Sequence, residues 1–483
     1  MLNFRRFTLQ NATSTSFGFS NIGRKSAIGS FNGHHVSSDG GALLLKEIEN
    51  KFGIINRFAK CFKDNRNQNF VEHSLNSILT QRIFGLILGY EDLNDHDQLR
   101  YDPLFAAAVG KSDIHGKNRA NPDDQGKALA GKSTLNRFEL SASKDESDDR
   151  YKKFDIDLEE ASEILTKVFL EKTKAPPLEI ILDIDNTDAK IHGNQEGKHY
   201  HSYYDGDCFM PFYVFSGKDL LRATLKTSDI HPMKYVVAEI SAVVIKIKEK
   251  WPDVKITIRG DSGFCCDELM DYCEKNSIYF LLGLPKNNRL DENVKEELIA
   301  VQEEYKKTNE PILKYKEFVH QTLDSWSKPR RVIAKMEQKD KNTYHRFIVT
   351  SLPADQIDPK SLYEKIYCPR GEMENRIKEQ QLGLFADRMS THYLKSNQVR
   401  LLLSSVAYVF LNLIRERALK GTELASAQSG TIRLKLLKIG VVVTETFRQI
   451  RFSFSQSFVY KETFLKVLAY FQGLDEKDTF ICS

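Results

Sequence analysis

Apolar residues recur at helical spacing through the first third of the chain. The stretch ALLLKEIENKFGIINRFAKCF follows the polar sequence Ser37-Ser38-Asp39-Gly40-Gly41, and VEHSLNSILTQRIFGLILGY repeats the pattern at 71–90. A short polar side chain before such a stretch is typical of a helix N-cap. We therefore predict an N-terminal arm at 1–37 and a helical N-terminal domain at 38–150. The last ten residues of that domain, SASKDESDDR, predict an exposed linker because they are polar and aperiodic.

The pattern changes after residue 175. LEIILDID, at 178–185, is a nearly continuous apolar run, as expected for a strand buried on both faces. Two further strands follow, then a helix, the strand VKITIRGD at 254–261, a short helix and the strand IYFLLGLPKN. Three strands, helix, strand, helix and strand within 175–290 predict an α/β domain with a mixed sheet.

Three segments follow this α/β region. Residues 291–355 contain β-prone stretches between polar turns, which predict an inserted β-rich domain. Helices at about 359–382 and 398–419 then return the chain to the α/β domain, over 356–420. In the C-terminal region, 421–483, TIRLKLLKIG and VVVTETFRQIRFSF predict a hairpin of strands.

Composition narrows the class of protein. The 70 basic and 66 acidic residues nearly balance at a net charge of +4, so any basic surface must be local. The seven cysteines show no CxxC or Cys/His ligand spacing, which argues against a zinc site or a disulfide framework. No uninterrupted apolar run approaches the roughly 20 residues that cross a bilayer. We therefore expect a soluble protein of a reducing compartment with no membrane partner.

Acidic residues stand at the ends of two predicted strands. Asp183 and Asp185 end the first strand, and Asp261 ends the fourth. If these strands are parallel neighbours, their carboxylates converge at one edge of the sheet. Glu374, on the helix at 359–382, can supply a third carboxylate. Such oxygen donors suit Mg²⁺ or Mn²⁺, although a single Asp at a strand end is more often a turn former or a helix cap.

The helix with Glu374 has one charged face. Tyr367, Arg370, Glu374, Lys378 and Gln381 are spaced by 3, 4, 4 and 3 residues, which places them on the same side. Arg370 is suited to hold a phosphate through two hydrogen bonds, and Lys378 to neutralise one as a point charge. The alternative is a solvated face with ion pairs between successive turns.

These residues resemble the DDE transposases of bacterial insertion sequences, in the branch with a Tyr-Arg-Glu-Lys signature. The motifs are Tyr367-Cys-Pro-Arg370-Gly-Glu-Met-Glu374, LDIDNTD and IRGDSGF. The resemblance implies an RNase H-like mixed five-stranded sheet with flanking helices, interrupted by the β-rich insertion. It also implies two Mg²⁺ ions, with Mn²⁺ as a substitute, at catalytic Asp185, Asp261 and Glu374. Asp185 is chosen over its acidic neighbours because the family pattern is Asp, any residue, Thr.

One signature position departs from the family. The last position is Gln381 in place of lysine, so Lys378, one turn earlier, either replaces the phosphate-binding lysine or has no such role. The sequence leaves this choice open.

The resemblance also implies the reaction and its partners, with the helical N-terminal domain at 38–150 as a DNA-binding domain. Water and then a DNA 3′-hydroxyl attack phosphodiesters of double-stranded DNA, which releases the element's terminal inverted repeats and joins them to target DNA. A hairpin on the element's ends is a possible intermediate in this branch. Because two ends must meet, we expect a homodimer in a synaptic complex, in the bacterial cytoplasm at the nucleoid.

Two segments are locally basic. Residues 305–346 hold 11 Lys/Arg against 5 Asp/Glu, and Trp326 lies among cations, where it could stack on an extruded base. The expected DNA-binding residues are therefore Tyr367, Arg370, Lys378, Trp326, Lys328, Arg330 and Arg331. A lone tryptophan is at least as often a core residue. Between residues 433 and 451, only Glu445 opposes Arg433, Lys435, Lys438, Arg448 and Arg451.

Two other functions compete with transposition. Asp183-Ile-Asp185-Asn-Thr187 also fits the loop of haloacid dehalogenase-like phosphohydrolases, with Asp183 as nucleophile and Asp261 and Asp267 as magnesium ligands. That function gives no role to the charged helix face or to the basic insertion. The second alternative is an inactive DNA-binding derivative of a transposase, for which the loss of the signature lysine would be a first sign.

Overall fold

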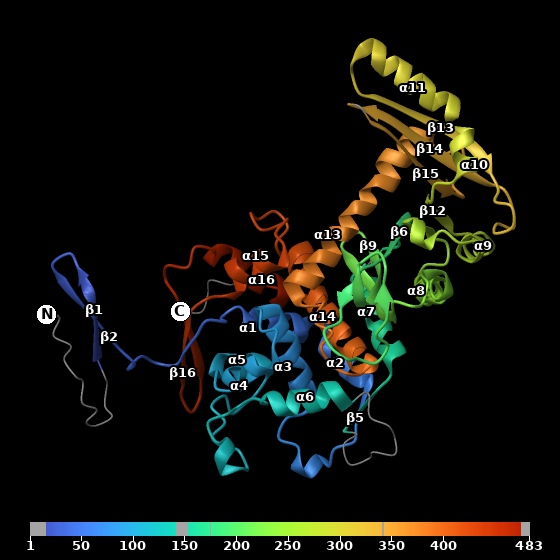
Figure 1. Ribbon diagram of the computed structural model, residues 1–483. Coiled ribbons are helices and arrows are strands. Elements are labelled where there is room, and N and C mark those ends of the chain that lie inside the picture. The colour runs from blue at the N-terminus through green and yellow to red at the C-terminus, as the bar shows by residue number, and fades with distance from the viewer. Residues whose placement is uncertain (1–15, 142–152, 174, 341, 475–483) are drawn as a thin grey trace.

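The computed structural model describes residues 16–141, 153–173, 175–340 and 342–474. The linker expected at 141–150 lies outside these residues except for Ser141. A helical body, built from both ends of the chain, lies beside a long sheet whose far end projects away from it (Figure 1).

The central part of the sheet has five strands. These are β6 (Glu179–Asn186), β9 (Gly206–Ser216), β10 (Asp219–Thr227), β11 (Lys255–Gly260) and β12 (Tyr279–Leu284). Their spatial order is β10-β9-β6-β11-β12. Strands β6, β11 and β12 are parallel, and β9 is antiparallel to both of its neighbours. The predicted α/β class with a mixed sheet is confirmed.

Alternate residues of these strands face different layers, because successive side chains in a strand point to opposite sides. Leu182 and Ile184 of β6 enter the apolar core on one face. The helices on that face are α8 (Val236–Lys250) and α9 (Asp267–Lys275). Asp183 and Asp185 therefore face the opposite side, which a helix between Pro359 and Gly383 crosses.

The segment at 291–355 extends the same sheet. Strand β15 (Asn342–Thr350) pairs antiparallel with β12, and β14 (Arg330–Lys339) and β13 (Ile312–His320) follow outward. Two helices that the sequence did not predict, α10 (Asn288–Asn293) and α11 (Lys295–Thr308), precede these strands. The strands expected here are therefore continuous with the central sheet, because the edge of β12 would otherwise be left unpaired.

The N-terminal part is helical, as predicted. Its main helices are α1 (Ala42–Phe52), α2 (Ile54–Lys60), α3 (Leu75–Leu88), α5 (Pro103–Val109) and α6 (Lys132–Ser141). Buried Glu139 accepts hydrogen bonds from Arg82 Nε at 2.8 Å and Arg400 Nε at 2.7 Å. This carboxylate joins α3 and α6 to α14 (Leu394–Leu413), the long helix that also packs on β10.

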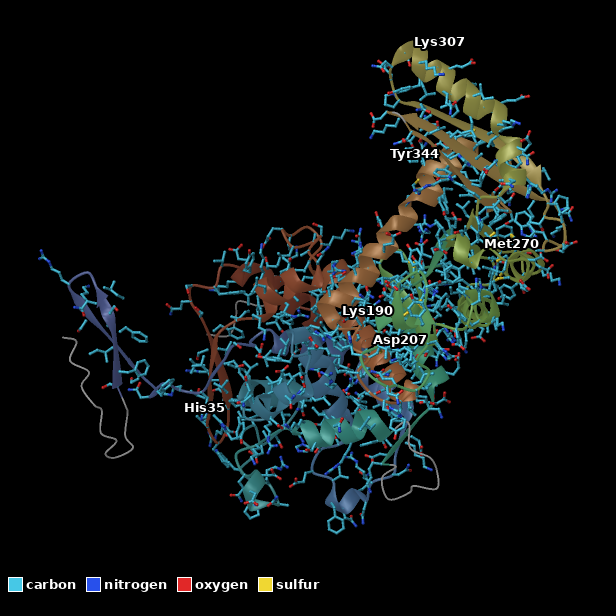
Figure 2. The ribbon with its side chains drawn as sticks, in the orientation of Figure 1. His35, Lys190, Asp207, Met270, Lys307 and Tyr344 are labelled. Carbon is cyan, nitrogen blue, oxygen red and sulfur yellow. The ribbon has the colours of Figure 1, made fainter. Side chains whose placement is uncertain are left out.

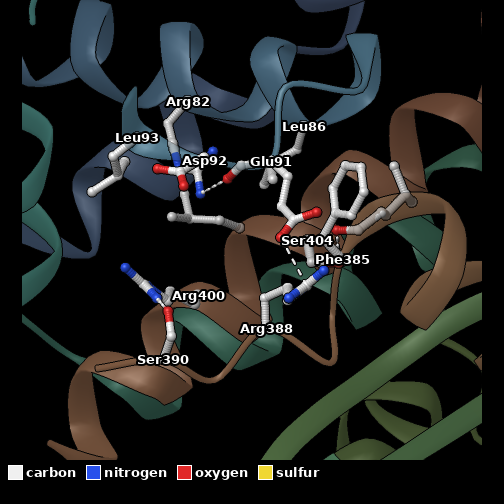
Figure 3. Close-up of a pocket in the computed structure, with 12 residues that line it drawn as sticks. Arg82, Leu86, Glu91, Asp92, Leu93, Phe385, Arg388, Ser390, Arg400 and Ser404 are labelled. Atoms are coloured by element: carbon white, nitrogen blue, oxygen red, sulfur yellow. Dashed lines mark hydrogen bonds and ion pairs between the residues drawn. The ribbon is translucent and has the colours of Figure 1, made fainter. Parts of the chain in front are cut away.

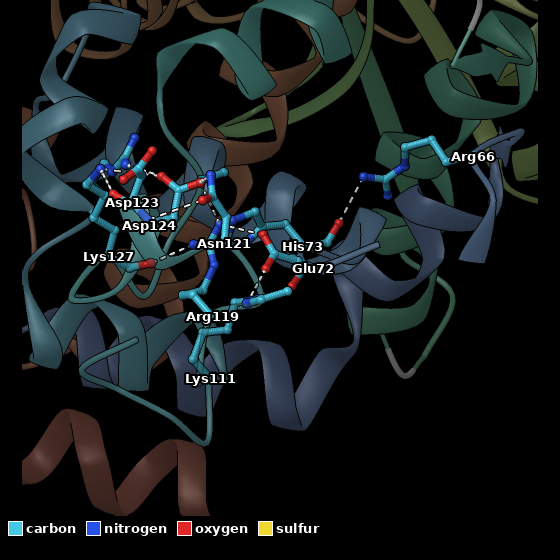
Figure 4. A network of polar contacts seen from close by, with 12 residues as sticks. Arg66, Glu72, His73, Lys111, Arg119, Asn121, Asp123, Asp124 and Lys127 are labelled. Atoms are coloured by element: carbon cyan, nitrogen blue, oxygen red, sulfur yellow. Dashed lines mark hydrogen bonds and ion pairs between the residues drawn. The ribbon is translucent and has the colours of Figure 1, made fainter. Parts of the chain in front are cut away.

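A polar network closes the loop between α5 and α6 (Figure 4). Arg119 Nη2 lies 2.6 Å from Glu72 Oε2, and the second oxygen of Glu72 accepts from the amide of Ala120 at 2.9 Å. Asp124 pairs with Arg100 at 3.0 Å. These cations are neutralised within the fold, so this loop offers less positive charge to a ligand than its sequence alone indicates.

The Ser-Ser-Asp-Gly-Gly segment does not cap α1 with a side chain. Asp39 instead accepts hydrogen bonds from Tyr90 Oη and Lys438 Nζ, both at 2.6 Å. A Cβ atom on Gly41 would lie 2.3 Å from Leu437 Cα, which shows how closely the two segments pack. The Ser-Ser-Asp-Gly-Gly segment therefore packs against the C-terminal region and holds it at the start of α1.

The predicted strand TIRLKLLKIG is wrong. Residues Ser429–Ile432 and Arg433–Leu437 form helical turns in which Ile432, Leu436 and Leu437 are buried together. The hairpin itself is present one segment later, as β16 (Val441–Glu445) and β17 (Ile450–Phe454). Helix α16 (Lys461–Gln472) then packs against α1.

Among the described helices, one is long and apolar enough to cross a membrane. It comprises α14 and its continuation to Ala418, and 89% of its most apolar window is buried inside the protein. This burial is typical of a core helix.

Candidate active site

The structure brings the two strand-end carboxylates to one edge of the sheet. Asp185 is the last residue but one of β6, and Asp261 directly follows β11. Ile184 is the register partner of Gly260 in these parallel neighbours, so Asp185 and Asp261 continue from adjacent strand ends. The sequence predicted the two strand ends, and the structure shows that the strands are the parallel neighbours which their convergence requires.

The helix between Pro359 and Gly383 carries Glu374 to the same edge. It contains a π-helical turn (Leu362–Tyr367), a tight turn with Pro369, α13 (Gly371–Lys378) and a second π-helical turn (Glu379–Gly383). Proline has no N–H to donate inside a helix, and π-helical turns are frequent at functional sites. In Figure 1 the helix runs from the strands β13–β15 to the end of β6.

Arg370 lies between two of the acids. Its Nη1 atom is 3.0 Å from Asp185 Oδ2, and its Nη2 atom is 3.4 Å from Glu374 Oε1. Asp185 is buried, whereas the side chain of Glu374 is 52% exposed. A single guanidinium thus bridges the strand end and the helix.

The charges of Asp261 and Glu374 both act on Asp185. The pKa of Asp185 is raised to about 7, chiefly by burial and also by the nearby charges of Asp261 and Glu374, against the opposing effect of Arg370. Asp261 Oδ1 accepts a hydrogen bond from the amide of Gly263 at 2.9 Å, which fixes the carboxylate at the strand end. The three carboxylates therefore share one electrostatic environment, which favours a cation.

Tyr367 lies against the same edge. A Cβ atom on Gly283 of β12 would be 2.8 Å from Tyr367 Oη, so the glycine leaves room for the ring. Burial raises the pKa of Tyr367, and the neighbouring charge of Asp261 also raises it. The face with Tyr367, Arg370 and Glu374 is therefore turned towards the sheet, which excludes a purely solvated helix face.

A family model described as Transposase DDE domain group 1 matches residues 19–476. The chain belongs to this family of DDE transposases. No curated protein matches the chain.

The donor set of the transposase, three carboxylates, fits divalent cations in its chemistry. Among the described residues, no three His, Cys, Asp or Glu side chains have the spacing of a ready metal site. The guanidinium of Arg370 takes up the space between Asp185 and Glu374. Carboxylate oxygens are hard donors suited to Mg²⁺ or Mn²⁺, provided that Arg370 moves and Glu374, exposed on its helix, turns inward.

The phosphohydrolase alternative is inconsistent with the position of Asp183. Both carboxylate oxygens of Asp183 accept hydrogen bonds from Arg259, at 2.5 and 2.8 Å, and both side chains are buried. Asp267, the expected magnesium ligand, pairs with Arg330 at 2.6 Å. A nucleophile needs an accessible oxygen, and Asp183 has none.

The position of the signature lysine is occupied by Gln381. Its Nε2 atom donates to Asp188 O at 2.9 Å and to Thr187 Oγ1 at 3.2 Å, directly beyond the first acid. Lys378 is exposed on the neighbouring turn. Gln381 thus ties the helix to the end of β6 through neutral hydrogen bonds.

The base-stacking position predicted for Trp326 is wrong. The ring is 6% exposed, packs edge-on against His320 and has the guanidinium of Arg330 nearby, with centroid distances of 5.8 and 5.7 Å. Trp326 lies in the loop between β13 and β14, and its apolar surface joins the core on the α8 and α9 face of the sheet in place of contact with water.

The cations near Trp326 are paired with acidic residues of the protein. Arg330 pairs with Asp267 at 2.6 Å and Glu274 at 3.0 Å, and Arg331 pairs with Glu317 at 2.6 Å. Lys328 is half-exposed but lies 3.0 Å from Glu274. Local acids therefore neutralise these predicted DNA-binding residues, which the excess of basic residues in the sequence could not reveal.

Two of the basic residues in the C-terminal region also have structural roles. Arg433 Nε donates to Ile87 O at 2.6 Å, and Lys438 pairs with buried Asp39. Lys435 lies over the ring of Tyr460. Arg448 and Arg451, at the hairpin of β16 and β17, are exposed.

Two cavities lie at the end of the helix that carries Glu374. The first has a volume of about 240 Å³ and is lined by Arg82, Arg388 and Arg400. Figure 3 shows Arg388 turned towards Glu91, and its Nε atom lies 2.7 Å from Glu91 Oε1. The second, of about 290 Å³, is lined by Lys190 and His192 and reaches Asp188 and Gln381. Sequence reasoning missed these cations because they come from separate segments of the chain, such as α3, α14 and the loop with Arg388, that meet only in the folded protein.

Proposed function

We propose that this transposase cleaves and joins DNA by metal-dependent phosphoryl transfer on an RNase H-like core. The observation that carries the proposal is the approach of Asp185, Asp261 and Glu374 from β6, β11 and the helix after the insertion. The strand order, with the first strand between the second and the fourth, supports the RNase H-like arrangement. The Arg370 bridge explains how these acids are stabilised before metal binding.

Asp185 and Asp261 would hold two Mg²⁺ ions, with Mn²⁺ as a substitute, and Glu374 would complete the set. Such a pair of ions stabilises both the attacking and the leaving oxygen of an in-line displacement. Arg370, once released from the carboxylates, is suited to bind a phosphate through two parallel hydrogen bonds. Tyr367 and Lys378 then contact the DNA backbone on either side of Glu374.

The substrates follow from this chemistry. Water attacks the phosphodiester at the element's terminal inverted repeat, and the 3′-hydroxyl that is released attacks target DNA or, in a hairpin intermediate, the opposite strand. The two ends of the element are brought together by two copies of the chain. The setting that this function implies is the bacterial cytoplasm, at the nucleoid.

The test is cleavage and strand transfer on a labelled duplex that carries the terminal repeat, taken from the DNA beside the coding frame. Asp185→Asn, Asp261→Asn and Glu374→Gln should each lower the Mg²⁺-dependent rate by roughly 10³-fold, because each removes a charged ligand of the metal ions that would stabilise the transition state. DNA binding in the absence of metal should persist. Asp253→Asn, at the opposite end of β11, is the matched control because Asp253 is exposed and remote from the site.

Binding of Mn²⁺, followed by electron paramagnetic resonance, gives a readout independent of turnover. The wild type should bind the ion and the three variants should bind it more weakly. Cleavage that needs metal but is unchanged in Glu374→Gln would exclude Glu374 from the site.

A further inference from the structure

The N-terminal hairpin stands apart from the rest of the molecule. Strands β1 (Ser16–Ile22) and β2 (Lys25–Ser30) form a two-stranded sheet and have no other strand partner among the described residues. Figure 1 shows the hairpin projecting beyond the helical body, and in Figure 2 its side chains extend outward past the labelled His35. The protein thus extends a narrow β-ribbon into its surroundings.

This ribbon exposes large apolar side chains. Phe19 is 64% exposed, Ile22 76% and Ile28 72%. A two-stranded hairpin alone is at best marginally stable in water, and exposed apolar groups of this kind mark interaction sites. The hairpin therefore requires a partner that covers it.

Charge identifies the kind of partner. Residues 1–38 contain Arg5, Arg6, Arg24 and Lys25 but no Asp or Glu, whereas basic and acidic residues nearly balance over the whole chain. Arg24 and Lys25 lie at the tip of the ribbon, directly after Ile22 and Gly23. An acid-free arm with its cations at the tip is complementary to a polyanion, and it is poorly matched to a second copy of this nearly neutral chain.

We propose that the hairpin β1–β2 is a DNA-binding arm whose tip enters a groove of the duplex. This inference rests on the proposed function, in which duplex DNA is the substrate. A two-stranded ribbon fits the width of the major groove, and apolar side chains flanked by cations are used as wedges in the minor groove. Arg24 and Lys25 neutralise phosphates, and Ile22 contacts the sugars and bases between them.

Fluorescence anisotropy with a labelled terminal-repeat duplex, over a series of salt concentrations, tests the arm in the full chain. The Arg24→Ala/Lys25→Ala variant should bind roughly tenfold more weakly at low salt, with the slope of log K against log salt smaller by about 1.8, or 0.9 for each phosphate. The matched control is Arg24→Lys/Lys25→Arg, which keeps both charges and should retain the wild-type slope. The melting temperature should not change, because the tip lies outside the cores.

Ile22→Ser separates the apolar contact from the ionic ones. Its affinity should fall several-fold at every salt concentration while the slope stays that of the wild type, because no phosphate contact is lost. An Ile22→Ser variant with wild-type affinity would contradict the insertion of the tip into a groove.

Light scattering at the same protein concentrations addresses the rival partner. If the charge-removing variant keeps the wild-type affinity and slope, or if hairpin variants lose dimerisation while each protomer binds DNA as before, the arm is not a DNA-binding element and the inference is overturned. If the wild type itself neither binds nor cleaves the duplex, the proposed function fails first. Wild-type cleavage together with an unaffected Arg24→Ala/Lys25→Ala variant overturns the arm alone.

Discussion

Arg259 and Asp183 are register partners on neighbouring strands and form a buried ion pair, with side chains 7% and 6% exposed. Arg259 lies two residues before Asp261, and Asp183 lies two residues before Asp185. Arg259 Nη1 also donates to the carbonyl of Ile366, in the helix that carries Glu374. A single guanidinium thus links the three elements from which the three acids project, and it does so on the face that the acids share.

Arg259→Lys should impair the site more than it impairs the fold. A lysine keeps the charge but cannot hold two carboxylate oxygens and a carbonyl at once. We expect a roughly 10- to 100-fold loss of Mn²⁺ affinity and of strand-transfer rate, the range found when partners that orient metal ligands are removed. Mn²⁺ binding is measured by electron paramagnetic resonance beside thermal melting.

The control for this substitution is Arg222→Lys. Arg222 on β10 is equally buried and pairs with Glu239 and Glu159 at the far side of the sheet. Both variants should melt at lower temperature, because each weakens a buried ion pair. Equal losses of Mn²⁺ affinity in the two variants would show that Arg259 has only a structural role.

Lys378 and Gln381 should prove to have different roles. Lys378→Ala should reduce the salt slope of DNA binding by about 0.9, as expected for one lost phosphate contact, and Lys378→Arg should restore it. Gln381→Ala removes the neutral tie to Thr187 and Asp188, so it should slow cleavage while the slope stays unchanged. A reduced slope in Gln381→Ala but not in Lys378→Ala would reverse the assignment. Fluorescence anisotropy and single-turnover cleavage measure the two effects.

Because His96 is buried, the protein should be less stable in mild acid than at neutral pH. Burial lowers the pKa of its ring from 6.5 to about 3, and Nδ1 lies 3.1 Å from Gln81 Nε2. The unfolded chain therefore binds a proton that the folded chain rejects, so this contribution is fully present above pH 6.5 and decreases as the pH falls towards 3. Between pH 7 and pH 5 the expected loss is about 2 kcal/mol.

Urea unfolding of the wild type and His96→Gln at both pH values measures this loss. The free energy of unfolding should differ less between pH 7 and pH 5 in His96→Gln than in the wild type, whatever the effect of the glutamine on absolute stability. His34→Gln, at an exposed position, is the control. The assignment to His96 does not hold if the wild type and His96→Gln lose equal stability between the two pH values.

Gly41→Ala should destabilise the protein through the junction of its N- and C-terminal segments. The added Cβ would lie 2.3 Å from Leu437 Cα and 2.9 Å from Leu436 O, and these backbone atoms cannot move aside without shifting the helical turn. We expect a loss of about 2 kcal/mol or more in the free energy of unfolding. Gly430→Ala, where a Cβ meets nothing within 4 Å, should leave the urea midpoint unchanged or slightly raised.

The sequence predicted the elements that have strong local patterns. The apolar run before Asp185, the run before Asp261 and the spacing of the helix with Glu374 were sufficient to place three acids on the correct strands and helix. TIRLKLLKIG was misassigned because its apolar positions fit a strand as well as a helix, and only burial of Ile432 and Leu436 on a shared core distinguishes the two.

By itself the sequence determined the α/β class, the strand ends at which acidic residues stand and the charged helix face, because strand and helix periodicity are local properties of the chain. Only the tertiary structure decided which cations remain available: Arg330 and Lys438 are neutralised by Glu274 and Asp39, acids at least fifty residues away in sequence. The tertiary structure also decided that Arg370 bridges Asp185 and Glu374, and that β13–β15 extend the central sheet. The reason is that ion pairs and strand pairing depend on distances in space, which a linear pattern of residue types does not contain.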